Sequence, residues 1–284
     1  PLVGEITTVS NAKPHPVREK QMSEDELVKL ASEKMKRATR RPDMSGDNVK
    51  NMRDVFKQTV EDVKLGRMTK LVKPTSDGQT VTSRMPVEQT SSKGDVKVRC
   101  VDDFLTSGVN GLCSVNAKIS MGRIQDVVYS AKRLVAAGHK NLVIIKSDFK
   151  AAYRACPIKK KHLKHARVVV FDPDEQCHWM STQLAMPFGA VGAVYAWDRL
   201  GQCLQYLLCR ILKLPLSRFV DDLFAIVPAD GAQQCVDWML EVVSLLGFCL
   251  APDKTPPPNV RQVVLGVELE YKFCERREKV SYSI

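Results

Sequence analysis

The chain has 284 residues, and 43 Lys and Arg against 32 Asp and Glu give it a formal net charge of +11. Its 44% hydrophobic and 26% charged residues are typical of a globular protein, which excludes collagen-like and fully disordered classes. No apolar run approaches the roughly 18 residues of a membrane helix and no secretory leader is recognisable, so we expect an intracellular protein without a membrane span. The excess of positive charge favours polyanionic partners. Because the first residue is Pro1 rather than Met, we expect a fragment or a processed product.

The N-terminal part of the chain is predicted to contain two helices. Ser23 and Glu26 form a capping box, so the first helix is expected to begin at Ser23. It ends before Pro42 in a group of four cations, Lys36, Arg37, Arg40 and Arg41. Cations suit the C-terminal end of a helix, so a solvated helix end and a phosphate contact both account for this group. The second helix is predicted over residues 48–65.

From residue 74 onward, strands and helices are predicted to alternate. Residues 74–94 are rich in Ser, Thr, Gly and Asp and are expected to form strands and exposed loops. Hydrophobic patterns then predict strands over residues 96–101, 142–145, 167–171, 178–183, 218–227 and 263–271. Helices are predicted over residues 121–137, 192–212 and 233–246. This mixed order, in which one sheet carries acidic residues, predicts an α+β fold.

Nine cysteines are spread along the chain, an odd number that does not suit a disulfide framework. None forms a Cys-x-x-Cys pair, and although Cys177 lies beside His178, no second pair stands at zinc-finger spacing. We therefore expect small buried thiols in a reducing compartment, and no zinc site.

Acidic residues interrupt two strands that are otherwise apolar. Asp148 follows the apolar run 142–145, and Asp221 and Asp222 lie between apolar flanks within residues 218–227. A buried carboxylate is costly unless it binds a cation or a donor, and two adjacent ones favour a divalent cation that relieves their repulsion. For the adjacent pair, a hairpin turn that presents both acids to water is the alternative.

Five segments in order along the chain carry a family resemblance. They are Asp148-Phe149-Lys150-Ala151-Ala152-Tyr153, Met186-Pro187-Phe188-Gly189, Phe219-Val220-Asp221-Asp222, Leu246-Gly247-Phe248 with Lys254, and Val264-Leu265-Gly266-Val267. In this order they resemble the palm motifs of reverse transcriptases, over roughly residues 97–271. The Pro-Phe-Gly turn and the late Leu-Gly are most similar to the polymerases of gypsy-like and DIRS-like retrotransposon polyproteins.

The resemblance implies an RNA-directed DNA polymerase that adds dNTPs to a primer 3′-hydroxyl by two-metal phosphoryl transfer. Asp148 and Asp221 would then hold two Mg²⁺ ions, with Mn²⁺ as a possible substitute, and Asp222 would lie close by as a less strict ligand. Lys254 matches the lysine that protonates pyrophosphate, although it is one lysine among many. Phe219 stands where many family members have Tyr, and this departure leaves the acids of the motif intact.

The resemblance also implies which residues contact the incoming nucleotide. Tyr153, five residues after Asp148, matches the bulky residue that excludes a ribose 2′-hydroxyl; a core tyrosine is the alternative. Phe149, Phe188 and Gly189 are expected to bind the nucleotide, the last two in the cleft that also holds the template. Retroviral enzymes have Gln at the position of Phe188, so their hydrogen bonds are not carried over.

Two further pairs match family positions. Lys97 and Arg99 share one strand face and match the basic strand of the fingers that grips the triphosphate. Edge-strand charges that discourage aggregation are the alternative for this pair. Leu265 and Gly266 resemble the turn that positions the primer end, where glycine permits a close backbone approach.

A basic run extends from Lys159 to Arg167, with five cationic side chains and no acid. Within a polymerase, Lys159, Lys160 and Lys161 are expected to contact the template backbone. A solvated face is the alternative, since isolated charge runs commonly have no other role.

The implied architecture is the right-hand polymerase fold, with fingers, a ferredoxin-like palm and a missing or truncated thumb. The expected ranges are an N-terminal extension at 1–47, fingers at 48–140 and 157–185, palm at 141–156 and 186–272, and the start of a thumb or connection at 273–284. The implied partners are an RNA or DNA template with its primer, dNTPs, and further polyprotein domains such as a thumb, an RNase H, and an integrase or recombinase. No membrane partner is expected.

Two other functions fit the sequence less well. A catalytically silent palm-fold protein that binds nucleic acid or partners would have no reason to keep three costly acids in apolar strands. An RNA-dependent RNA polymerase of the same palm type typically carries an acid where Tyr153 stands.

Overall fold

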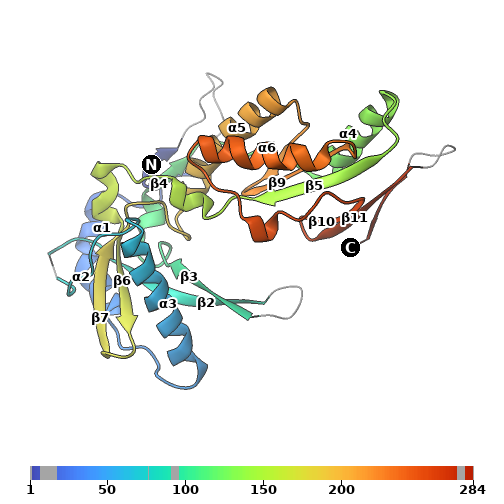
Figure 1. Cartoon of the computed structure of the whole chain (residues 1–284). Helices are drawn as coiled ribbons and strands as arrows, with labels where there is room; N and C mark the ends of the chain where they lie inside the picture. The colour runs from blue at the N-terminus through green and yellow to red at the C-terminus, as the bar shows by residue number, and fades with distance from the viewer. Residues whose placement is uncertain (1, 7–17, 76, 91–95, 274–278, 284) are drawn as a thin grey trace. The chain divides into compact units, whose positions relative to one another are not determined.

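The computed structural model describes residues 2–6, 18–75, 77–90 and 96–273, and the backbone of 279–283. The chain divides into two compact units, each made of two chain segments (Figure 1). Unit 1 comprises Pro1–Lys118 and Tyr153–Ala196, and unit 2 comprises Ile119–Ala152 and Trp197–Ile284. Helices combine with several sheets, so the protein is of mixed α/β type, compatible with the predicted α+β class. Within the described ranges, no helix is both long and apolar enough to cross a membrane.

Unit 1 contains a four-stranded sheet with the strand order β3-β2-β6-β7. Its strands are β2 (Thr82–Thr90), β3 (Val96–Asp102), β6 (Arg167–Asp172) and β7 (Cys177–Thr182). Strand β2 pairs with β3 antiparallel and with β6 parallel, and β6 and β7 form an antiparallel hairpin. Strand β3 is therefore an edge of this sheet. Two short strands, β1 (Gly4–Ile6) and β4 (Cys113–Val115), pair in parallel.

Three helices of unit 1 precede the sheet in the chain. They are α1 (Glu24–Lys29), α2 (Ala31–Ala38) and α3 (Asp47–Lys64). The predicted capping box is present, because the Ser23 hydroxyl accepts from the Glu26 N–H and the Glu26 carboxylate accepts from the Ser23 N–H. The single helix predicted from Ser23 is divided at Leu30 into α1 and α2. Helix α3 packs on β2 and β6 and buries Met52 and Val55.

Charged side chains are buried in unit 1 between the sheet and α3. Arg84 on β2 donates from Nε to Asp102 Oδ1 at 2.7 Å, and its Nη1 lies 3.5 Å from Asp62 Oδ2. Arg154 donates to the same oxygen of Asp62 at 2.5 Å and to Gln183 Oε1 at 2.6 Å, while Gln183 donates to Asp102 at 2.6 Å. Burial lowers the pKa of Arg84, but the charge and hydrogen bond of Asp102, together with the charges of Cys100 and Asp62, outweigh this and raise the pKa. We call these five residues the buried ionic cluster, in which every charge faces an opposite one.

Unit 2 contains two antiparallel sheets (Figure 1). The first has the order β5-β9-β8, with β5 (Leu142–Asp148), β8 (Ser217–Phe219) and β9 (Asp222–Pro228). The second consists of β10 (Arg261–Val264), β11 (Val267–Lys272) and β12 (Lys279–Ser283). The helices are α4 (Ile124–Ala136), α6 (Ala232–Leu245) and, from Trp197 on, α5 (Val191–Leu212).

The core of unit 2 forms where α4 meets β5 and β9. Val127 and Ala131 of α4 pack with Ile144 of β5 and Ile226 of β9, and the second sheet adds Leu269. Strand β5 begins as an unbroken apolar run, which is typical of a buried strand. This core fixes the register of β5 and β9, so that the acid at the end of β5 and the acid at the start of β9 lie at the same end of the strand pair.

Most predicted elements are confirmed. The helices predicted over residues 48–65, 121–137, 192–212 and 233–246 are α3, α4, α5 and α6. The strands predicted over residues 96–101, 142–145, 167–171 and 178–183 are β3, β5, β6 and β7. The strand predicted over residues 218–227 is instead the β8–β9 hairpin, and the one over 263–271 is the β10–β11 hairpin, because each chain segment reverses at a two-residue turn.

The compact units do not follow every predicted domain limit. Helix α4 falls in the range 48–140 expected for the fingers, yet its buried face packs in unit 2. The range 273–284, expected to begin a thumb, lies largely outside the described residues; the backbone of Lys279–Ser283 pairs with β11. The assignment of fingers and palm stays a prediction.

Candidate metal and catalytic site

The acidic pair of unit 2 lies at the hairpin between β8 and β9. Phe219 pairs with Asp222, so the loop consists of Val220 and Asp221 alone. Val220 has a φ of 52°, in the left-handed region that a β-branched residue adopts only under strain. A two-residue loop with a positive φ at its first position matches a type II′ turn, where glycine is usual. The turn that presents Asp221 is therefore strained.

Three neighbouring groups hold this turn. The Val220 carbonyl oxygen accepts from Trp197 Nε1 at 2.8 Å and from Arg218 Nη1 at 2.5 Å. The Val220 N–H donates to Met121 Sδ at 3.2 Å. Trp197 and Arg218 are almost completely buried, and Arg218 forms an ion pair with Asp198. These contacts make the strained turn the stable conformation.

Two glycines leave room for Arg218. A Cβ atom at Gly122 would lie 2.9 Å from the Arg218 backbone nitrogen, and one at Gly201 would lie 2.9 Å from its guanidinium group. None of the residues that hold the turn was predicted to act at the site. The one signal in the sequence was a cation, Arg218, directly before the apolar flank of the acidic pair.

Asp148 and Asp222 face each other across the sheet. Asp148 ends β5, Asp222 begins β9, and the register pairs the two directly. Residues directly opposite on antiparallel strands have their Cβ atoms about 4.5–5.5 Å apart on one face. The Phe149 N–H donates to the Asp221 carbonyl oxygen at 2.9 Å, which ties the turn to the end of β5. The sheet thus brings together three acids that were predicted from two distant segments.

Lys254 contacts the same group of acids. Its Nζ donates to Asp148 Oδ2 at 2.8 Å from a short 3₁₀ helix, η4 (Pro252–Lys254). The backbone fixes this approach, because the Ala251 N–H donates to the Asp148 carbonyl oxygen at 2.8 Å and Leu250 bridges Phe149. The Lys254 side chain is 55% exposed, so it borders the acids without being buried among them.

The site carries an excess of negative charge. Burial, together with the charges of Asp221 and Asp148, raises the pKa of Asp222 to about 6, although Lys254 and Lys146 act in the opposite direction. Burial lowers the pKa of Lys254, but its hydrogen bond to Asp148 and the nearby carboxylates outweigh this and raise it. At pH 7 the carboxylates repel one another, so a further cation would bind favourably.

A cavity of about 410 Å³ opens beside these side chains, and its lining includes Asp148, Asp222, Asp253 and Lys254. Carboxylate oxygens are the hard ligands that Mg²⁺ prefers, and Mg²⁺ keeps several waters, so two or three acids are a suitable donor set. Asp148, Asp221 and Asp222 fit this ion chemically. As the side chains stand, no three His, Cys, Asp or Glu residues in the described part of the chain converge closely enough to hold a metal ion.

The predicted turn at Leu265 and Gly266 is confirmed. Val264 pairs with Val267, so these two residues form the whole loop between β10 and β11. Their φ angles of 51° and 79° match a type I′ turn, in which both central residues are left-handed. Contact of this turn with a primer stays a prediction.

Phe149 has a buried side chain. It is 2% exposed, and its ring packs edge-on against Trp197 with the centroids 5.0 Å apart. The side chain therefore belongs to the core of unit 2, and the predicted contact with a nucleotide would have to involve the backbone.

Tyr153, Phe188 and Gly189 lie together in unit 1. The rings of Tyr153 and Phe188 have centroids 5.1 Å apart, and Phe188 is 40% exposed. Gly189 has a φ of 96°, and a Cβ atom there would overlap the Asp102 carbonyl oxygen, so only glycine fits. Asn110 donates to the Gly189 carbonyl oxygen at 2.9 Å and was not predicted. The segment after Pro187 is thus fixed against the end of β3.

Lys97 and Arg99 are exposed on the edge strand β3. Their i, i+2 spacing places both on one face of the strand, as predicted. Arg99 Nε donates to Gln89 of the neighbouring strand. The edge position suits both a triphosphate contact and protection against aggregation, so both interpretations stay open.

The basic run is divided by the fold. Lys159–Lys161 are exposed, but Lys164 pairs with Glu24 at 2.5 Å. Arg167 is buried and pairs with Asp77 at 2.6 Å. Two of the five cations of the run therefore serve ion pairs within unit 1. Only Lys159–Lys161 keep the predicted role of template contacts.

Comparison with known proteins adds no relative. No family model matches the chain, and no curated protein matches it in sequence. The feature that bears most directly on function is therefore the pair of Asp148 and Asp222 beside the turn that holds Asp221, because like charges directly opposite each other on a sheet cost stability.

Proposed function

We propose that this chain is an RNA-directed DNA polymerase of the kind found in retrotransposon polyproteins. The observation that carries the proposal is the register that sets Asp148 opposite Asp222, beside the turn that holds Asp221. Burial and the charges of Asp221 and Asp148 raise the pKa of Asp222, which is typical of a site that binds cations. The five motifs that resemble reverse transcriptases occur around them in the expected order.

Two Mg²⁺ ions, or Mn²⁺ in their place, are the cofactor that suits these residues. Asp148 and Asp221 would hold the ions, with the third acid beside them. Bound there, the ions lower the pKa of the primer 3′-hydroxyl and stabilise the charge of the leaving pyrophosphate. The part played by the chain itself is to keep the acids in register and the Val220 turn fixed through Trp197 and Arg218.

Lys254 would act on the leaving group. Because nearby carboxylates raise its pKa, its ammonium group stays protonated at pH 7. The new bond joins the primer 3′-oxygen to the α-phosphorus as the bond from that phosphorus to the bridging oxygen breaks. The proton of the 3′-hydroxyl leaves to solvent, and Lys254 gives its proton to pyrophosphate.

The proposal includes the right-hand fold, with most of unit 2 as palm and most of unit 1 as fingers. In this assignment Tyr153 excludes the ribose 2′-hydroxyl, Phe188 lines the nucleotide and template cleft, and Lys97 and Arg99 hold the triphosphate. The exposed lysines Lys159–Lys161 would follow the template backbone, and the turn at Leu265 and Gly266 would meet the primer end.

Single-nucleotide addition to a DNA primer on an RNA template, with Mg²⁺ and either dNTPs or rNTPs, tests the proposal. We expect addition of dNTPs, reduced at least about a hundredfold by Asp221→Asn, because loss of a ligand should cost more than loss of an outer-shell partner. Asp237→Asn, at an exposed acid on α6, is the matched control. Binding of template and primer without addition supports a silent palm-fold protein, and addition of rNTPs alone supports an RNA polymerase.

Selection of the sugar is tested at Tyr153. Replacement by valine removes the ring next to Phe188, so Tyr153→Val should lower discrimination between dNTPs and rNTPs by at least about tenfold. The ratio of kcat/KM for the two substrates is the measurement, and Tyr206→Val on the exposed side of α5 is the control. Unchanged discrimination would remove Tyr153 from this role.

A further inference from the structure

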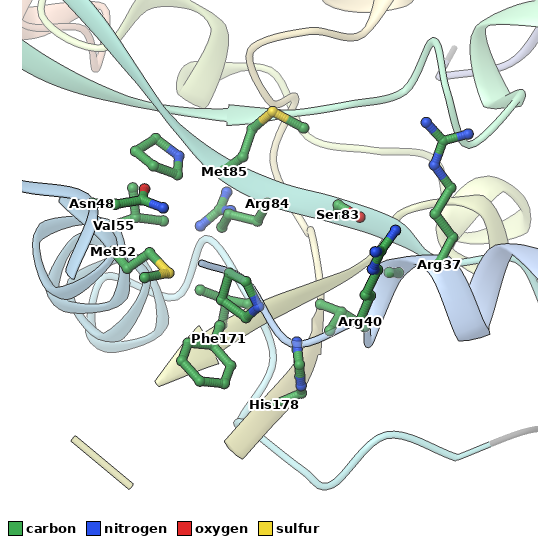
Figure 2. A pocket seen from close by; sticks show the side chains of 15 residues that line it. Arg37, Arg40, Asn48, Met52, Val55, Ser83, Arg84, Met85, Phe171 and His178 are labelled. Carbon is green, nitrogen blue, oxygen red and sulfur yellow. The ribbon is translucent and has the colours of Figure 1, made fainter. Parts of the chain in front are cut away.

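A second cavity, of about 180 Å³, lies in unit 1. None of the residues assigned above to metal, nucleotide, template or primer lines it. Figure 2 shows Arg37 and Arg40 on one side and residues of α3 on the other, with β2 crossing above and Phe171 and His178 below. Helices α2 and α3 and strands β2, β6 and β7 therefore all contribute to its walls.

The rim of this cavity is cationic. Arg37 and Arg40 are exposed, and among the described residues neither guanidinium group has an ion-pair or hydrogen-bond partner, whereas Arg41 donates to Gln176 at 2.8 Å. Arg84, deeper in the wall, belongs to the buried ionic cluster and is already paired. No described Asp or Glu lines the cavity. The C-terminal end of α2 by itself favours nearby cations. That preference does not explain why these two arginines lie beside a cavity.

The floor is apolar and aromatic. Its lining includes Met52, Val55, Met85 and Phe171. Phe171 and His178 are a cross-strand pair whose rings meet edge to face with centroids 4.9 Å apart. Burial lowers the pKa of His178, against the effect of its hydrogen bond with the backbone of Arg40, so the imidazole is neutral at pH 7. A flat ring can lie here without meeting an unpaired charge, since Arg84 is already paired with Asp102.

The size and chemistry of the cavity narrow the ligand. Complete sites for small molecules occupy roughly 300–1,000 Å³, so 180 Å³ holds one ring system and leaves the rest of the ligand outside. The cationic rim calls for an anionic group attached to that ring. We propose that this cavity binds a nucleotide, with the base on the apolar floor and the phosphate at Arg37 and Arg40.

A free nucleotide and a nucleotide within a single strand share this chemistry. A strand has phosphates on both sides of each base, and the rim offers two arginines three residues apart. The site needs neither the acids of unit 2 nor polymerase activity, so its test is a binding experiment.

Fluorescence anisotropy of a labelled thymidine octanucleotide, and of an abasic oligomer of the same length, tests the proposal on the whole chain. Ala38→Leu places bulk in the cavity and should weaken the octanucleotide about fivefold while leaving the abasic oligomer unchanged. The double variant Arg37→Gln/Arg40→Gln should weaken both ligands and reduce the slope of log K against log salt by up to about 2. Lys29→Gln/Lys36→Gln, outside the cavity, removes the same charge and should change binding less.

Several results would overturn the base pocket. Equal affinity of the unsubstituted chain for the octanucleotide and the abasic oligomer is one, and an Ala38→Leu variant that binds both as before is another. If the arginine pair and the lysine pair have equal effects on binding, Arg37 and Arg40 contribute no more than other nearby cations. This comparison does not depend on Ala38→Leu, whose folding is checked by circular dichroism.

Competition by free thymidine monophosphate at equal concentration identifies a free nucleotide as the ligand, and absence of competition identifies a single strand. Both results support the proposal. Primer extension is not measured, so failure here leaves the polymerase proposal intact.

Discussion

In unit 1, Asp102 and Asp62 lie against the guanidinium groups of Arg84 and Arg154, whereas in unit 2 Asp148 faces another carboxylate, Asp222, across a β-ladder. Both groups are buried or half-buried and both join segments far apart in the chain. The two groups differ in how their charges are arranged. In the buried ionic cluster each acid faces a guanidinium group, while in unit 2 Asp148 faces the like charge of Asp222 and pairs with Lys254, whose side chain is 55% exposed.

This difference separates structural from functional acids. Buried opposite charges hold a fold together once both are present, because removal of one leaves the other uncompensated. Like charges directly opposite each other on a sheet are destabilising, so they are expected where another requirement, such as binding a cation, outweighs stability. The comparison predicts opposite responses when one charge is removed from each group.

The largest effect is expected in the buried ionic cluster. Arg84→Met leaves Asp102 buried without its main partner and should lower the free energy of unfolding by about 3–5 kcal/mol. Urea unfolding followed by circular dichroism measures this change. Arg53→Met, which removes one side of an exposed pair with Asp174, is the matched control and should change stability little. Similar results for the two variants would break the comparison.

The opposite response is expected at Asp222 in metal-free protein. Its pKa of about 6 in the folded state lies above the value of 3.8 for an ordinary aspartate, so the folded state holds the proton more tightly and loses stability as pH rises through 6. Asp222→Asn removes this loss and, since solvent screens a half-buried carboxylate, should raise the free energy of unfolding at pH 8 by about 1–2 kcal/mol, with little difference near pH 4. Urea unfolding in EDTA at both pH values measures it.

Asp230→Asn, at an exposed acid after β9, is the control for that experiment and should show no comparable dependence on pH. A variant at Asp222 that is less stable than the unsubstituted chain at pH 8 would mean that this carboxylate is structural, and the contrast between the two units would be lost.

Much of the framework that presents the acids was predictable from local sequence. The apolar run 142–145 identifies β5 and delivers Asp148 at its end, and the adjacent Asp221 and Asp222 mark the site because polar residues rarely interrupt such strands. The capping box at Ser23 predicts the start of α1 in the same local way. These features depend on a few neighbouring residues, which is the range over which a sequence pattern acts.

The contacts that complete the site depend on residues far apart. Lys254 meets Asp148 across 106 positions, and Asp198 meets Arg218 through the packing of a helix on a hairpin, so no spacing rule reveals either pair. The hairpin turn at Val220 could not be predicted from the sequence for a different reason. Valine at a left-handed position gives no turn signal, since glycine or asparagine is what a pattern would show there.

The smallest effect is expected from relief of that strain. Val220→Gly removes the side chain that opposes a φ of 52° and keeps the carbonyl that accepts from Trp197 and Arg218, so we expect the free energy of unfolding to rise by about 1 kcal/mol. The gain is limited because glycine also has more conformational freedom to lose on folding. Lys213→Gly, at an exposed loop residue with a φ of 55°, should give a similar gain in the free energy of unfolding.

The two variants should differ in single-nucleotide addition. The rate should fall only for Val220→Gly if the rigid valine turn fixes Asp221. An equal rate for both would show that the strain at Val220 serves the fold alone, and it would move this turn to the structural side of the comparison.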